Sequence, residues 1–104
     1  MQPNMKEMMR QAQLLQNKLN KMQEELKHRT VEVTVGGGMI KAVANGKPEI
    51  ISINIEKEVV DPEDVEMLQD LVVAAVNEAL ERSRQMMEDE MSKITGGMKL
   101  PGMF

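Results

Sequence analysis

The chain has 104 residues and a mass of 11.7 kDa, which is enough for one domain. It has no cysteine and one histidine, which excludes disulfide frameworks, thiolate zinc sites and multi-histidine metal centres. No apolar run approaches the roughly 20 residues that span a bilayer, and the N-terminus lacks the apolar core of a signal peptide. We therefore expect a cytoplasmic protein. Its only aromatic residue is Phe104 while 12 residues are methionine, so burial is expected along long helices and between subunits.

The net charge of −4 is unevenly distributed along the chain. Residues 1–30 carry six basic and three acidic side chains, a net charge of +3. Residues 31–104 carry seven basic and fourteen acidic side chains, a net charge of −7. The overall acidity argues against a nucleic-acid partner, whereas the basic N-terminal segment is compatible with one.

Residues 1–29 are predicted to form a projecting helix with Pro3 in its first turn, since neither Gly nor Pro occurs between Pro3 and Arg29. Apolar residues recur at alternating spacings of three and four, the a/d pattern of a coiled-coil heptad. These residues are Met5, Met8, Ala12, Leu15, Leu19, Met22 and Leu26. Because the stripe is narrow, we expect the helix to pack against one partner helix and to leave its other faces in water.

Residues 30–56 are predicted to form a meander of three antiparallel strands. The first strand alternates valine with polar residues and ends at Gly36–Gly38. The second strand, 39–44, ends at Asn45-Gly46, a pair typical of tight hairpins because both positions tolerate positive φ. The third strand, 47–56, alternates isoleucine with polar residues. Its apolar face carries Ile51, Ile53 and Ile55.

Residues 61–95 are predicted to form a second long helix. Asp61 is expected to cap this helix and Pro62 to occupy its first position. A wide apolar stripe follows over residues 65–80, and two glycines after Thr95 end the helix. The last residues, 96–104, are expected to form a flexible tail.

The predicted helices are too long for a compact body of this size. At about 1.5 Å per residue they measure roughly 40 and 50 Å, whereas a compact domain of 100 residues has a radius of gyration of about 13 Å. The uncovered apolar stripes and the free sheet edges predict a homodimer. The predicted interface residues are Val33, Ile51, Ile53, Ile55, Leu68, Leu71 and Val72.

No group of residues predicts catalysis, a cofactor or a metal site. The acids at 61–66 are explained by helix capping and by the preference for acids in a first helical turn. Gly36–Gly38 lies between two strands and lacks the Lys-Ser/Thr pair of a phosphate-binding loop. We therefore expect no enzyme, no cofactor, no small-molecule substrate and no membrane partner.

The outward face of the first helix is the best candidate for a binding surface. Lysine, arginine and amide side chains on such a face can contact phosphates without reading bases. On charge alone, a solvated surface helix is an equally good interpretation. The predicted DNA-binding residues are Lys6, Arg10, Lys18, Lys21, Lys27 and Arg29.

Several short motifs occur in a fixed order along the chain. They are Gly36-Gly37-Gly38, Asn45-Gly46, Glu49-Ile50, Asp61-Pro62-Glu63-Asp64 and Thr95-Gly96-Gly97. The series resembles the YbaB/EbfC family of bacterial nucleoid-associated proteins, and the resemblance covers essentially the whole chain. It implies an α+β fold with an α-β-β-β-α subunit and a tweezer-like homodimer with projecting helices. It also implies binding to double-stranded DNA, organisation of the nucleoid and an effect on gene expression.

A prefoldin-like holdase is the alternative from another functional class. Such a protein would hold unfolded chains with the apolar tip of its first helix, where Met5, Met8 and Met9 lie. Methionine at these spacings is also an ordinary helix-packing residue, so the stripe alone does not decide between the two functions.

Overall fold

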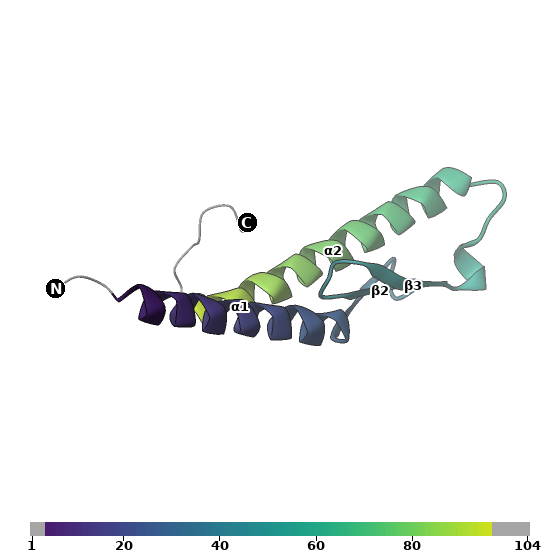
Figure 1. Ribbon diagram of the computed structural model, residues 1–104. Helices are drawn as coiled ribbons and strands as arrows, with labels where there is room; N and C mark the ends of the chain where they lie inside the picture. Colours follow the sequence, from purple (N-terminus) through teal and green to yellow (C-terminus); the bar gives the residue numbers. More distant parts are fainter. Residues whose placement is uncertain (1–3, 97–104) are drawn as a thin grey trace.

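The structure, a computed structural model, describes residues 4–96 (Figure 1). Its elements are α1 (Met5–Lys27), β1 (Thr30–Val35), β2 (Ile40–Asn45), β3 (Ile50–Ile55), the short 3-10 helix η1 (Lys57–Val59) and α2 (Val65–Thr95). This order confirms the predicted α-β-β-β-α subunit. Pro3 and the predicted flexible tail after Gly96 lie outside the described residues. Within the described part of the chain, no helix is both long enough and apolar enough to cross a membrane.

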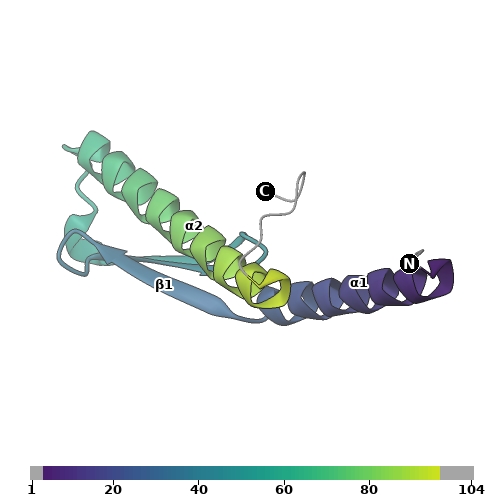
Figure 2. The ribbon, with the colours of Figure 1, turned by 90° about the vertical axis from the view of Figure 1, so that its left-hand side faces the viewer.

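The molecule is long and thin. Its principal extents are 73 × 21 × 16 Å, and its radius of gyration is 19.7 Å, against about 13 Å for a compact domain of this length. In Figures 1 and 2, α2 lies along the sheet and α1 extends away from it. The prediction that the helices project beyond the sheet is confirmed for α1 and for the last turns of α2, which leave the sheet and pack against α1.

The strands form one antiparallel sheet in the order β1-β2-β3, as predicted. α2 lies across one face of this sheet, mainly over β1 and β2. The centre of this core consists of small and β-branched residues: Val33, Ile40, Ala42, Ala44, Ala75 and Ala79. Alanines on both sides let the helix approach the sheet closely, so this core needs no aromatic side chain.

The loop between β1 and β2 depends on three successive glycines. Gly36, Gly37 and Gly38 have φ angles of 63°, 68° and 91°. Side chains with a Cβ rarely adopt this left-handed region, and three such residues in succession would be strained. The glycine run is therefore a turn between two strands, as the sequence predicted.

The prediction of a tight hairpin with positive φ at Asn45-Gly46 is wrong. Asn45 is the buried last residue of β2, and Gly46 does not adopt a positive φ. The side-chain oxygen of Asn45 accepts hydrogen bonds from the backbone N–H groups of Lys47 at 3.0 Å and Glu49 at 2.9 Å, which shapes a longer turn. Its amide nitrogen donates to the carbonyl oxygen of Lys27 at 3.3 Å, which ties the turn to the end of α1.

Gly46 brings this turn into direct contact with the backbone of α1. Its N–H lies 2.8 Å from the carbonyl oxygen of Leu26 and 3.1 Å from that of Arg29. A Cβ at Gly46 would lie 2.8 Å from the Leu26 carbonyl oxygen, so glycine is required by close approach. The hydroxyl of buried Ser83 on α2 donates to the carbonyl oxygen of Asn45. Leu26, Asn45, Gly46 and Ser83 are called the α1 junction below.

α2 begins at Val65, whereas the sequence predicted a start at Asp61. Asp64 caps the helix, because its carboxylate accepts a hydrogen bond from the backbone N–H of Met67 at 3.2 Å. Asp61 instead shapes the turn that precedes the helix. The predicted end of the helix at Thr95 is confirmed.

The apolar seam of α1 is covered only over its C-terminal half. Leu19, Met22 and Leu26 are buried against α2, where Met91 is the buried partner. By contrast, Met5 near the start of α1 is 72% exposed. The predicted single partner helix is therefore α2 of the same chain, and it covers half of the seam.

Replacing Gly46 by alanine should destabilise the fold by about 1–3 kcal/mol, because the new methyl group overlaps the backbone of α1. Lys47→Ala is the matched control in the same turn, and since Lys47 is exposed it should change stability by no more than about 0.5 kcal/mol. Urea unfolding followed by circular dichroism at one protein concentration measures both variants. Equal unfolding midpoints for the two variants would contradict this account of the junction.

Candidate nucleic-acid interface

Charged side chains are segregated along the length of the molecule. Residues 4–29, which form α1 and the turn after it, carry six basic and three acidic side chains. Residues 56–70, which lead from β3 into α2, carry seven acidic side chains and one basic side chain. These two segments lie at opposite ends of the molecule (Figure 1). A polyanion is therefore attracted to the α1 end and repelled from the other end.

The structure does not bring the six predicted DNA-binding residues onto one face. All six are exposed, and they fall into four groups along α1 and the turn after it. Lys6 and Arg10 lie on the projecting half of α1, Lys18 and Lys21 on one side of its contact with α2, Lys27 on the other side, and Arg29 in the connection to β1. These residues therefore form separate basic groups.

The projecting half of α1 presents Lys6 and Arg10 to solvent. The guanidinium of Arg10 pairs with the carboxylate of Glu7 at 2.6 Å, and both side chains are largely exposed. An exposed pair of this kind contributes little stability, so Arg10 can exchange Glu7 for a phosphate at small cost.

A cleft between α1 and the end of α2 gathers basic side chains from both helices. It has a volume of about 310 Å³ and contains Lys18 and Lys21 of α1 and Lys93 of α2. These three lysines are called the basic cleft below. Two carboxylates, those of Glu25 and Glu90, also line it. Sequence reasoning missed Lys93 because it lies in the acidic half of the chain, and only the packing of α2 on α1 brings it to the other lysines.

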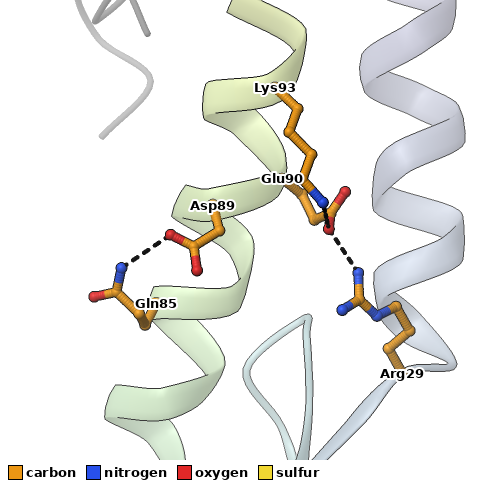
Figure 3. A network of polar contacts seen from close by, with 5 residues as sticks. All are labelled: Arg29, Gln85, Asp89, Glu90 and Lys93. Carbon is orange, nitrogen blue, oxygen red and sulfur yellow. Dashed lines mark hydrogen bonds and ion pairs between the residues drawn. The ribbon is translucent and has the colours of Figure 1, made fainter.

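Glu90 holds two cations at the edge of the basic cleft (Figure 3). Its Oε1 accepts hydrogen bonds from Nη1 of Arg29 at 2.8 Å and from Nζ of Lys93 at 2.9 Å. The hydrogen bond from Arg29, followed by that from Lys93, lowers the pKa of the Glu90 carboxyl below its ordinary value. Glu90 therefore remains ionised at neutral pH and links the turn after α1 to α2. Arg29 is engaged in this link, and its role as a phosphate ligand stays a prediction.

The other side of the α1–α2 contact is a larger groove of about 440 Å³. Methionines of α2 and the end of the α1 seam contribute its apolar lining, and Lys27 and Lys47 lie at the same groove. Lys27 is 3.7 Å from the carboxylate of Glu24, a second exposed pair. The helix contact thus separates Lys27 from the basic cleft.

The predicted dimer-interface residues fall into two sets. Val33 is buried beneath α2, and Leu68, Leu71 and Val72 pack against the same core within their own chain. Three isoleucines of β3 are open to solvent, with exposed fractions of 57% for Ile51, 36% for Ile53 and 41% for Ile55.

The strand register explains why β3 remains open. Ile53 lies opposite Ala42, and Ile55 lies opposite Ile40. Directly opposite residues share one face of an antiparallel pair. Both isoleucines therefore lie on the same face of the sheet as Ala42 and Ile40, which α2 covers. Because α2 lies over β1 and β2, the part of this face formed by β3 is uncovered. A register shift next to Ala44 displaces Ile51 from this alternation.

Residues 1–98 match the model of the YbaB/EbfC DNA-binding family. The chain belongs to this family. A nucleoid-associated protein of Caldanaerobacter subterraneus subsp. tengcongensis is 58% identical over 97% of this chain and 91% of its own length. A nucleoid-associated protein of Desulforamulus reducens is 59% identical over 97% and 96%, respectively. The crystal structure of an uncharacterized Helicobacter pylori protein matches with a TM-score of 0.82 and 18% identity, covering 91% of this chain and 100% of that one, which shows a shared fold.

Proposed function

We propose that this YbaB/EbfC chain is a nucleoid-associated protein that binds double-stranded DNA mainly through phosphates. In this role it organises the nucleoid and modulates gene expression. The segregation of charge is the observation that carries the proposal, because within the described chain residues 4–29 form the segment with a net positive charge, which attracts a polyanion. Membership of a DNA-binding family supports DNA as the partner, and the relatives named nucleoid-associated proteins support the cellular role.

The proposed DNA surface has two parts, the projecting pair Lys6 and Arg10 and the basic cleft. Arg10 and Lys21 are about 16 Å apart along the helix axis at the α-helical rise. A B-DNA major groove is about 12 Å wide, so these two positions can contact phosphates on either side of one groove. The exposed groups are cations and amides that bind the backbone, and we expect little discrimination between sequences.

The family match gives no support to the holdase alternative. The half of the α1 seam nearest the sheet packs against α2 of its own chain, so it is not open to an unfolded client. We therefore retain DNA binding as the proposed function.

We also propose that two copies pair through the open β3 part of the sheet. Ile53 and Ile55 form an uncharged apolar surface next to the outer edge of β3, with which no strand of residues 4–96 pairs. A second copy of the same surface would bury these side chains and cover the edge about a two-fold axis. Such a dimer carries two α1 arms, each with its own basic groups.

Neutralising the basic cleft should weaken DNA binding and reduce its dependence on salt. We expect the combined Lys18→Gln, Lys21→Gln and Lys93→Gln variant to lower the magnitude of the log–log salt slope by roughly 0.9 for each phosphate that the protein no longer neutralises. Glu90→Gln should strengthen binding, because it removes a negative charge and releases Lys93. Fluorescence anisotropy with a short duplex across a salt series measures both effects.

Lys57→Gln is the matched control for this test. Like each of the three cleft substitutions it replaces one lysine by glutamine, but at the acidic end of the molecule, and it should leave affinity and salt slope unchanged. If the cleft variant keeps the wild-type slope, the phosphates are bound elsewhere on the protein. If the wild-type protein does not bind the duplex at all, the proposed function is wrong.

The dimer can be tested with one charge in the open part of the sheet. Ile53→Asp would place an unpaired carboxylate in the proposed interface and should yield a folded monomer of about 11.7 kDa by sedimentation equilibrium. Asn54→Asp is the control, since Asn54 follows Ile53 and faces the opposite side of the strand. Wild-type protein that sediments as a monomer, or Ile53→Asp that sediments as a dimer, would contradict the proposed interface.

A further inference from the structure

The first half of α1 exposes an apolar stripe that the described part of the chain does not cover. Met5 is 72% exposed, Met8 is 52% exposed, and Ala12 is also exposed. They continue the a/d seam, whose next members, the partly buried Leu15 and the buried Leu19, belong to the contact with α2. Met5, Met8 and Ala12 are called the distal seam below.

The distal seam lies on a helix that local contacts hold in shape. Asn4 caps α1 by accepting a hydrogen bond from the backbone N–H of Lys6 at 2.9 Å. Side-chain pairs one turn apart follow, namely Glu7 with Arg10, Gln13 with Asn17 and Gln16 with Asn20. Such pairs stabilise a helix away from the body of a protein. The stripe is therefore presented in a fixed form, which reduces the ordering cost of binding.

The residues that flank the distal seam suit a partner with the same sequence. In a coiled coil, the side chains at the e and g positions lie next to those of the partner helix. With Met5 at position a, the flanking positions of this segment are Asn4, Met9, Gln11 and Gln16, and all four are uncharged. A second copy would therefore meet no like charges across the contact, in either relative direction.

We propose that the distal seam pairs with the distal seam of a second copy, and that this contact joins two DNA-bound dimers. Lys6 and Arg10 lie on the side of the helix opposite the seam, at the outward heptad positions. Two paired arms would thus hold their basic faces roughly 20 Å apart and pointing in opposite directions. Each face can take its own duplex, so the pair bridges two DNA segments. The bridging step rests on the proposed DNA binding, whereas the pairing of the arms does not.

The contact is expected to be weak in free solution. The distal seam spans about two turns of each helix, and a contact of this length buries far less than the roughly 1,200 Å² of a stable protein interface. Binding of many copies along DNA raises their local concentration and turns a weak contact into an effective one. DNA should therefore promote the association of the arms.

A capture assay separates bridging from simple DNA binding. One duplex is fixed to a surface, protein is added, and retention of a second labelled duplex is measured alongside anisotropy with a single duplex. The combined Met5→Gln, Met8→Gln and Ala12→Gln variant should bind a single duplex like wild type and show roughly tenfold lower capture, because the apolar contact is removed. Leu14→Gln is the control, since Leu14 is 53% exposed but lies off the seam, and it should affect neither readout. Wild-type capture by the seam variant would overturn the proposal.

Cross-linking tests the pairing of the arms without DNA. The chain has no cysteine, so Met8→Cys and Leu14→Cys each introduce a single thiol, at positions that are 52% and 53% exposed in the parent chain. Met8 lies near the centre of the distal seam and meets its counterpart in either relative direction, so we expect disulfide-linked pairs from Met8→Cys, with a yield that rises with protein concentration, and few from Leu14→Cys. Equal yields would overturn the proposal, as would a yield that does not depend on concentration, because the arms would then meet inside one dimer. This readout decides the pairing even if the protein does not bind DNA.

Discussion

The close approach of Gly46 to the last turn of α1 sets the direction of that helix. The N–H of Gly46 lies 2.8 Å from the Leu26 carbonyl oxygen, a contact that leaves no room for a Cβ. Asn45 bonds to the end of the same helix, and Ser83 joins the turn to α2. With its last turn held from two sides, α1 extends away from the sheet as an arm (Figures 1 and 2). The basic cleft, the Glu90 link and the exposed distal seam all follow from this geometry.

Composition explains why the arm extends instead of folding onto the body. The core at the sheet is filled by alanines and β-branched residues, and the α1–α2 contact is filled by leucine and methionine. Side chains of this size form two small, separate hydrophobic clusters in the described part of the chain. This agrees with the large radius of gyration, 19.7 Å. The polar residues between the seam positions of α1 expose that side of the helix to water, and they include its lysines and arginine. A basic arm on an acidic body is therefore a result of the same sequence pattern that makes the arm long.

Much of the fold was predictable from local patterns, and the failures have tertiary causes. The helix α1, the three strands, the glycine turn and the end of α2 at Thr95 each depend on neighbouring residues, and the structure confirms them. Asn45-Gly46 was misjudged because glycine is needed there for contact with a helix distant in sequence. Asp61 and Asp64 are both residues that can cap a helix, and the sequence alone does not distinguish them. In the structure Asp64 caps α2, while Asp61 forms hydrogen bonds within the preceding turn. Lys93 was missed because a helical wheel of α1 contains no information on where α2 packs.

The central claim is that DNA meets the α1 end of the molecule, and an NMR titration tests it most directly. Backbone amide signals of ¹⁵N-labelled protein are followed as a short duplex is added at low salt, where phosphate contacts are strongest. We expect shifts along α1 and in the last turn of α2 around Lys93, and these shifts should reverse as salt is raised. Signals of the acidic segment 56–70 should stay in place. Shifts centred on that segment, with α1 unaffected, would contradict the claim.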